Sequence, residues 1–392
     1  MPVSKRAREI PPFIVMDVLE RAQELAAGGA EVIHLEVGEP DFDTPRCIKD
    51  AAIRALEDNH THYTHSLGII ELRRAIAQDY ARRYGVEVDP GRILVTSGTS
   101  PAMLLMFSAL LEPGQEVIIS DPGYACYANF ISFVGGVPAT VPVFEDDGFQ
   151  YRPEAIAERI GPATKGILIN SPANPTGQLL SRRRMEAIAA MAPGERRGPY
   201  LVSDEIYHGL VYQGQEHSVL EFTDEAFVLG GFSKLYAMTG WRLGYLIAPE
   251  RYMRPLQKMH QNFAICAPSM AQRAGIAALT EAADDVARMV QRYDARRRRM
   301  IDGLRELGLG IKVPPTGAFY VLARADHLDP DDYRLAFDIL EKAHVGVTPG
   351  RDFGQGGRGY LRFSYCNSLA NIEQGLERLH DYLRRYHPDR LP

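Results

Sequence analysis

The sequence predicts an α/β protein: a large domain with a mostly parallel sheet of the seven-stranded type covered by helices, and a smaller α+β domain built from both chain ends. Three observations support this fold. Short apolar runs alternate with helical patterns between residues 93 and 247, which is typical of parallel strands buried on both faces. After residue 269 the pattern changes to a long helical stretch followed by mixed strands and helices. The length of 392 residues favours two domains over a single core.

The elements can be assigned in order. Apolar residues at helical spacing predict a helix at residues 14–27, which Gly28 and Gly29 end. Residues 31–37 read as a strand, and 45–57 and 69–83 as two helices. Strands of the large sheet are expected at residues 93–96, 116–120, 166–170, 200–203, 226–229 and 244–247. A continuous helix at 269–307 should join the domains, with strands at 318–322 and 359–365 and helices at 331–343 and 370–386 beyond it.

These assignments give domain boundaries. Residues 1–46 are expected to form the N-terminal segment of the small domain, 47–285 the large domain, and 286–392 the C-terminal part of the small domain. Only thirteen residues precede the first expected helix, so we expect no additional DNA-binding domain before it.

The composition narrows the class of protein. A formal net charge of -6 gives no general attraction to nucleic acid or to an anionic membrane. No apolar run approaches the roughly 20 residues needed to cross a bilayer, and the charged N-terminus lacks the apolar segment of a signal peptide. Four cysteines without paired spacing fit a reducing compartment and form no metal-binding pattern. We therefore expect a cytoplasmic protein that binds no metal.

Polar or glycine-rich loops follow almost every predicted strand of the large sheet. They lie at residues 97–99, 121–123, 171–174 and 204–205. Ligands of open α/β sheets bind outside the carboxyl ends of the strands, so these loops should surround a binding site. A further loop contains Lys234, which follows an apolar strand and is flanked by small residues, with Arg242 eight residues later. A lysine that forms covalent adducts needs a desolvated, cation-rich setting, and an arginine can clamp a phosphate.

Over essentially its whole length the sequence resembles the fold-type-I, class I/II aminotransferases of the aspartate aminotransferase superfamily, because these motifs match that family in order. The resemblance implies that Lys234 is the catalytic lysine that carries pyridoxal 5'-phosphate. It implies that Asp204 pairs with the ring nitrogen, which keeps the ring an electron sink. The other cofactor-binding residues that it implies are Gly98, Thr99 and Ser100 at a helix start, Ser233 and Arg242 at the phosphate, Asn174 and Tyr207 at the phenolic oxygen, Tyr124 on the ring face, and Tyr63 from a neighbouring subunit.

The resemblance also implies the partners. Arg362 would grip the substrate carboxylate, with Gly38 as a backbone donor and Tyr124 and Asn174 also at the substrate. Tyr63 reaching a neighbouring subunit implies a homodimer with shared active sites. The implied reaction is a ping-pong transfer of an amino group from an L-amino acid to a 2-oxo acid such as 2-oxoglutarate, with Lys234 moving the α-proton.

The identity of the amino donor is open. Some bacterial relatives that prefer aspartate have a lysine in the phosphate loop, where this chain has Ser100, and a buried distal carboxylate without a cation would be unfavourable. Residues 10–14 are apolar and resemble a segment that lines the substrate pocket. These features favour a neutral aromatic or aliphatic donor. An aspartate or broad-range aminotransferase is the alternative, and a pyridoxal-phosphate C–S β-lyase is an alternative of another class.

Simpler interpretations exist for several motifs. Asp204 could cap a helix at 206–210, and Asn174 could only form a turn before Pro175. The motif GxGxxG at residues 354–359 precedes a strand rather than a helix, so it does not predict a dinucleotide site. The histidines at 60, 62 and 65 lack acidic or cysteine partners at metal-binding spacing. The basic run 296–299 is expected on the solvated face of its helix.

Overall fold

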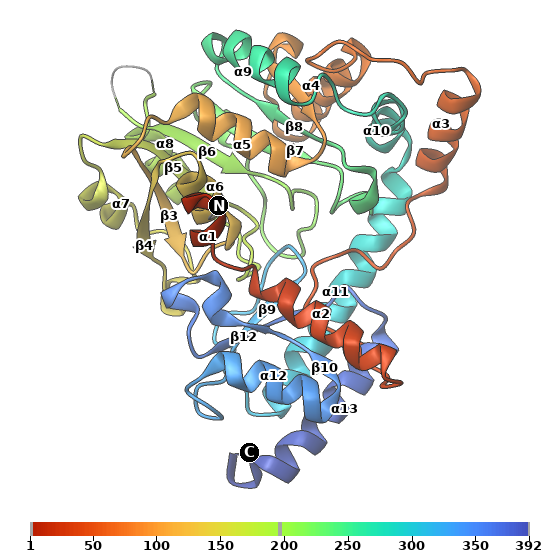
Figure 1. The fold of residues 1–392 in the computed structure, drawn as a ribbon, viewed down its shortest axis with the longest axis vertical. Helices are drawn as coiled ribbons and strands as arrows, with labels where there is room; N and C mark the ends of the chain where they lie inside the picture. The colour runs from red at the N-terminus through yellow and green to blue at the C-terminus, as the bar shows by residue number, and fades with distance from the viewer. Residues whose placement is uncertain (1–2, 195–197, 391–392) are drawn as a thin grey trace.

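A computed structural model describes residues 3–194 and 198–390, and its largest element is a seven-stranded sheet in the order β2-β8-β7-β6-β5-β3-β4 (Figure 1). Strands β3 to β7 are parallel, and β8 is antiparallel to its neighbours β2 and β7. The predicted α/β fold with a mostly parallel sheet is thus confirmed. The strands are β2 Ile93–Thr96, β3 Glu116–Asp121, β4 Val137–Pro142, β5 Thr164–Asn170, β6 Tyr200–Asp204, β7 Ala226–Gly231 and β8 Gly244–Ile247.

Helices cover both faces of this sheet. Successive strand residues point to opposite faces, so Leu201 of β6 belongs to one buried apolar cluster and Val202 to another. The cluster of Leu201 includes α4 and α10, and the cluster of Val202 includes α5, α6 and α9. The helices of this part are α3 Arg46–Glu57, α4 Ile70–Tyr84, α5 Thr99–Leu110, α6 Cys126–Phe133, α7 Pro153–Arg159, α8 Arg182–Met191, α9 Glu250–Phe263 and α10 Ser269–Glu281.

The smaller part combines both ends of the chain (Figure 1). It holds an antiparallel sheet in the order β11-β12-β9 and the parallel pair β1-β10. Near the N-terminus, α2 packs against α12, β10 and β11. The exact domain boundaries at residues 46 and 285 stay a prediction. The elements are α2 Ile14–Ala27, β1 Ile33–His34, α11 Ala283–Glu306, β9 Tyr320–Arg324, α12 Asp332–Ala343, β10 Val345–Gly346, β11 Thr348–Pro349, β12 Tyr360–Ser364 and α13 Leu369–Tyr386.

Several local predictions are wrong. The expected helix at 269–307 is two helices that break at the buried Ala282: α10 packs on α3 in the large part, and α11 packs on α13 in the smaller part. The strand at 31–37 shortens to β1, which pairs with only two residues of β10. A short helix, α1 Lys5–Glu9, lies ahead of the expected first helix. Strand β4 was not expected, because this edge strand alternates buried and exposed residues instead of forming an apolar run.

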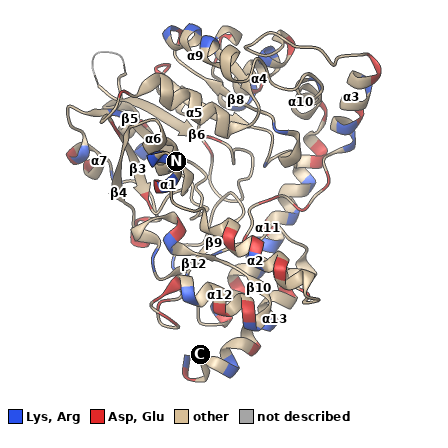
Figure 2. Ribbon diagram, viewed as in Figure 1, with Lys and Arg blue, Asp and Glu red and all other residues tan. Residues whose placement is uncertain are grey.

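Charged residues gather on the outer helices, as Figure 2 shows. The basic run of α11 departs from this rule, since Arg296 and Arg297 are only 8% and 4% exposed. Arg296 donates two hydrogen bonds to the carboxylate of Asp41, at 2.6 and 2.8 Å, and Arg297 bonds to Asp294 and to a backbone carbonyl. The expectation of a solvated face is wrong for these two arginines. Among the described residues, no helix has both the length and the apolar character that a bilayer span requires.

Candidate active site

The loops at the carboxyl edge of the large sheet meet residues of the smaller part around a cavity of about 180 Å³. Nine of the residues predicted for the site line it: Gly38, Thr99, Ser100, Tyr124, Asn174, Asp204, Tyr207, Lys234 and Arg362. They come from loops and strands separated by hundreds of residues. Strands β2, β3, β5, β6 and β7 all point their carboxyl ends toward this edge, so the parallel topology brings the loops together.

Lys234 lies in the loop after β7 with its amine in the cavity. Its Nζ donates a hydrogen bond to the carbonyl oxygen of Gly38 at 2.7 Å. Desolvation lowers the pKa of Lys234 below the ordinary lysine value, and the positive charges of Arg362 and Arg242 lower it further. A lysine with a lowered pKa has a larger fraction of neutral, nucleophilic amine, which is what covalent and proton-transfer chemistry requires.

Asp204 ends β6 and is 3% exposed at the wall of the same cavity. The hydroxyl of Tyr127 donates to its Oδ2 at 2.6 Å, and the backbone N–H of Ile206 donates to its Oδ1 at 3.2 Å. Burial raises the pKa of Asp204 to about 6, while these two donors oppose the rise. Residues after Asp204 form turns rather than the helix of the simpler interpretation. The carboxylate therefore faces the cavity with acceptor capacity left for a cationic partner.

A cradle suited to an anion lies at the start of α5. This helix begins after Gly98 and has no side-chain cap, so its first backbone N–H groups have no side-chain acceptor. Gly98 has φ +96°, and a Cβ there would lie 2.7 Å from Nη2 of Arg242, so the arginine packs directly against the loop. Arg242 itself is exposed and donates to the carbonyl of Thr239 at 2.8 Å. Gly98, Ser233 and Arg242 thus lie beside the cavity lining rather than within it.

Arg362 occupies the opposite side of the cavity on β12 and is 2% exposed. Its Nη1 donates to Oδ1 of Asn174 at 3.0 Å, and its Nη2 donates to Thr348 and to the carbonyl of Glu36. The guanidinium lies 4.4 Å from the ring centre of Tyr320. Its buried Nε has no hydrogen-bond partner, which is costly for a charged donor unless a ligand completes it.

Tyr320 and Tyr207 form a pair beside Arg362. The hydroxyls of Tyr207 and Tyr320 lie 2.9 Å apart. Gly38 is required here, because a Cβ at this position would collide with the Tyr320 ring. Tyr124 also reaches the cavity, and its ring makes edge contacts with Phe13 and Tyr127 at 6.0 and 5.2 Å between ring centres.

Phe13, from the apolar segment 10–14 that was expected at the substrate pocket, also lines the cavity. Eight further lining residues were not expected from the sequence: Val15, Met16, Val37, Met103, Tyr127, Asn170, Ile206 and Tyr320. Tyr127 had a usable signal, since it lies three residues after Tyr124 at the start of α6, one helical turn away. Tyr320 had none, because its position depends on the pairing of β9 and β12. Tyr63 lies outside the cavity and is 80% exposed, so its predicted contact with a neighbouring subunit stays a prediction.

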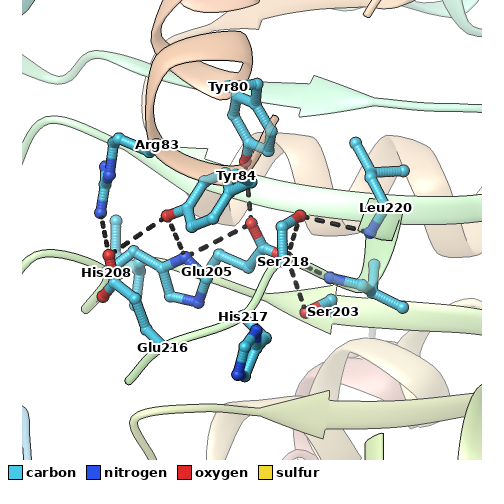
Figure 3. A network of polar contacts seen from close by, with 12 residues as sticks. Tyr80, Arg83, Tyr84, Ser203, Glu205, His208, Glu216, His217, Ser218 and Leu220 are labelled. Atoms are coloured by element: carbon cyan, nitrogen blue, oxygen red, sulfur yellow. Dashed lines mark hydrogen bonds and ion pairs between the residues drawn. The ribbon is translucent and has the colours of Figure 1, made fainter. Parts of the chain in front are cut away.

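A second buried polar cluster surrounds Glu205, the residue that follows Asp204 in the sequence (Figure 3). Glu205 points to the opposite face of the sheet and accepts hydrogen bonds from Tyr80, Ser203, Ser218 and the N–H of Val219, at 2.9 to 3.1 Å. The cluster continues through His208 and Tyr84 to the ion pair of Arg83 with Glu216. None of these side chains lines the cavity that holds Lys234.

The glycine-rich loop at 354–359 and the three histidines lie outside the cavity of Lys234. The loop at 354–359 leads into strand β12, which confirms that no helix follows it. The histidines at 60, 62 and 65 are exposed. Within residues 3–194 and 198–390, no group of three or more His, Cys, Asp or Glu is arranged to hold a metal ion.

Comparisons with known proteins decide the family. The family model described as aminotransferase class I and II matches residues 30–379. The chain belongs to the class I and II aminotransferases. It is therefore an enzyme that transfers nitrogenous groups, and this family is generally dependent on pyridoxal phosphate. The resemblance seen in the sequence is confirmed.

Relatives of known name differ in their substrates. The chain is 39% identical to a (5-formylfuran-3-yl)methyl phosphate transaminase of Methanocaldococcus jannaschii, covering 98% of this chain and 100% of that protein. It is 37% identical to a valine–pyruvate aminotransferase of Mycobacterium tuberculosis, with 95% and 97% covered. The solved structure of aspartate aminotransferase from Thermus thermophilus with maleate aligns with a TM-score of 0.93 at 37% identity, covering 97% of this chain and 99% of that one. These names fix the reaction class and leave the donor open.

Proposed function

We propose that this chain is a pyridoxal-phosphate-dependent aminotransferase that takes its amino group from a neutral aromatic or aliphatic L-amino acid and passes it to a 2-oxo acid such as 2-oxoglutarate. The observation that carries the proposal is the convergence of Lys234, Asp204 and Arg362 on one cavity beside an uncapped helix N-terminus. In this arrangement the lysine amine suits an aldehyde carbon, the carboxylate suits a cationic ring, and the guanidinium suits a substrate carboxylate.

The residues present fit pyridoxal phosphate. The start of α5 offers backbone donors, and Arg242 packs on Gly98 at the same place, so this cradle would hold the phosphate. Asp204, with unfilled acceptor positions, would hold the protonated ring nitrogen, and Tyr124, Asn174 and Tyr207 would surround the ring. When bound, the cofactor supplies an electron sink for the substrate's α-carbon.

The chain's own residues then have distinct tasks. The orphaned Nε of Arg362 and its fork geometry suit a substrate carboxylate, with the backbone of Gly38 nearby. Lys234, whose pKa is lowered by desolvation, would accept the substrate's α-proton at its Nζ and would donate the same proton to the cofactor carbon that receives the amino group.

The neutral donor is supported by the lining of the cavity. Among the described residues that line it, the basic ones are Lys234 and Arg362, assigned here to the cofactor and the α-carboxylate, and no third cation is among them for a distal carboxylate. Phe13, Val15, Met16 and Met103 present apolar surface instead. We further propose a cytoplasmic homodimer in which the exposed Tyr63 completes the neighbouring active site. Its four cysteines, all free, suit a reducing compartment.

The test is a half-reaction with purified holoenzyme. Single amino acids are offered without any oxo acid while the visible absorption of the bound cofactor is recorded. Loss of the initial band with leucine, phenylalanine, tyrosine, methionine or alanine supports a neutral donor, and the fastest of these names its class. Fastest conversion by aspartate overturns the neutral donor but keeps the aminotransferase. Release of pyruvate and ammonia from a cysteine conjugate, without conversion of any donor, favours the β-lyase.

A further inference from the structure

The glycine-rich segment at residues 350–359, which resembles a dinucleotide motif without being one, touches three walls of the active site. It consists of two short 3-10 turns, η5 Gly350–Phe353 and η6 Gln355–Gly357. Its glycines allow close approach: a Cβ on Gly350 would collide with the carbonyl of Gly357, and one on Gly354, at φ +112°, with the carboxylate of Asp121. The segment is therefore built to pack tightly beside the loop that carries Tyr124.

Asp352 of this segment caps a helix far away in the sequence. Helix α2 starts after Phe13, which provides no side-chain cap. The Oδ1 of Asp352 accepts the N–H of Ile14 at 3.0 Å, and its Oδ2 accepts the N–H of Val15 at 3.3 Å. The carboxylate is 8% exposed. It satisfies two of the four unpaired donors of this 14-residue helix and places a negative charge at the positive end of its dipole.

The capped turn forms the apolar wall of the cavity. Phe13, Val15 and Met16 line it on the side away from the sheet, and the ring of Phe13 packs edge-on against Tyr124. Met16 is 42% exposed, so packing alone holds it loosely. The position of this wall relative to Lys234 therefore depends on where Asp352 anchors the start of α2.

The same segment contacts Arg362 and the loop at residues 121–124, which carries Tyr124. The ring of Phe353 lies 4.8 Å from the guanidinium of Arg362. The carbonyl of Phe353 accepts the N–H of Gly123 at 2.9 Å, and the N–H of Gly356 donates to Asp121 at 2.7 Å. Residues 352 and 353 thus connect the apolar wall of Phe13, Val15 and Met16, and also Arg362, to one short stretch of backbone.

We propose that Asp352 is a positioning residue that sets the preference for the donor side chain, by holding the first turn of α2 against the substrate cavity. This inference rests on the proposed aminotransferase function with a neutral donor. Asp352 does not line the cavity and acts through Phe13, Val15 and Met16. Its loss should weaken binding of donors whose side chains reach this wall, and spare alanine, whose methyl group is too short to reach it.

The test compares Asp352→Ala holoenzyme with wild type in the half-reaction, using leucine, phenylalanine and alanine. Losing an N-cap carboxylate should raise the half-saturating concentration of leucine and phenylalanine by about fivefold, with the maximal rate nearly unchanged. Asp352→Asn keeps one acceptor oxygen and should give an intermediate change. Ser368→Ala is the matched control, since Ser368 caps α13 through the N–H of Asn371 and that helix does not line the cavity.

The decisive quantity is the ratio of half-saturating concentrations, leucine to alanine. An increase in this ratio for Asp352→Ala, a smaller one for Asp352→Asn and none for Ser368→Ala support the proposal. If both folded Asp352 variants keep the ratio within about twofold of wild type, the positioning role is wrong. If Asp352→Ala does not fold, the ratio for Asp352→Asn alone decides. Failure of wild type to convert any neutral donor would instead count against the proposed function.

Discussion

Asp204 and Glu205 are neighbouring carboxylates at the end of β6, and they have opposite surroundings. Asp204 lines the cavity, whereas Glu205 points toward α4 and accepts a hydrogen bond from Tyr80 of that helix (Figure 3). Four neutral donors surround the carboxylate of Glu205, with His208 3.6 Å away. Asp204 receives two hydrogen bonds, and burial raises its pKa to about 6.

Two equally buried carboxylates therefore differ in how many of their hydrogen-bond acceptor positions the protein fills, and unfilled positions beside a cavity indicate a binding role. Glu205 is saturated by the protein, so it stabilises the fold around the loop of Lys234. Asp204 keeps unfilled acceptor capacity at the wall of a cavity, where a cationic ring nitrogen can complete it. Both residues are almost fully buried and adjacent in sequence, so burial alone could not separate them.

Replacing Asp204 should have the largest effect on the reaction rate. Asp204→Asn is isosteric but neutral, so it should slow conversion of the best donor by on the order of 10²–10³-fold, measured in single-turnover absorption. The unfolding free energy of the variant should change little, because removal of a buried charge offsets the loss of one of the two hydrogen bonds that Asp204 accepts. A variant with wild-type rate would contradict the role of Asp204 at the ring nitrogen.

The pH dependence of stability gives the next largest effect, in protein without cofactor. Because the pKa of Asp204 is raised in the folded state, from 3.8 to about 6, its contribution to stability is complete at low pH and is lost as pH rises through about 6. The unfolding free energy of wild type relative to Asp204→Asn should fall by up to about 3 kcal/mol between roughly pH 4 and pH 7. Urea denaturation across this range measures the difference, and a flat profile would contradict the raised pKa.

Glu205→Gln should affect stability rather than chemistry. A side-chain NH₂ in place of one acceptor oxygen leaves buried donors of Ser203, Ser218 or Tyr80 without a partner. The unfolding free energy should fall by about 2–3 kcal/mol, while the rate of the folded enzyme stays within about threefold of wild type. A folded Glu205→Gln enzyme that loses activity as Asp204→Asn does would break the comparison.

Two matched tyrosines give the smallest effects. Tyr127 donates to Asp204 and Tyr80 to Glu205, and each is 2% exposed. Tyr127→Phe should raise the pKa of Asp204 further in protein without cofactor, so the fall of unfolding free energy with pH, which forms the acidic limb of the stability profile, should move upward by about one pH unit. Tyr80→Phe should leave that limb in place and lower the unfolding free energy by about 1 kcal/mol. Equal shifts of this limb in both variants would show that the hydrogen bonds to Glu205 also control the pKa of Asp204.

Much of the fold and site could be predicted because their signals are local. The apolar runs ending at Thr96, Asn170 and Ser203 predict strands whose carboxyl ends share one edge, and the motifs around Lys234 and Arg362 carry the family resemblance. Contacts between distant segments could not be predicted. Asp352 capping α2, Arg296 pairing with Asp41 and the break at Ala282 depend on packing that no local pattern encodes.

We propose that Lys234 moves the donor's α-proton within this cavity. The most direct test follows the half-reaction of wild type and Lys234→Ala, both loaded with pyridoxal phosphate, using the best neutral donor with hydrogen or deuterium at its α-carbon. Wild type should convert the deuterated donor more slowly than the normal one. The conversion rate of Lys234→Ala should be lower by about 10⁴-fold, although the variant should still bind the donor. Conversion by Lys234→Ala at the wild-type rate would contradict the account.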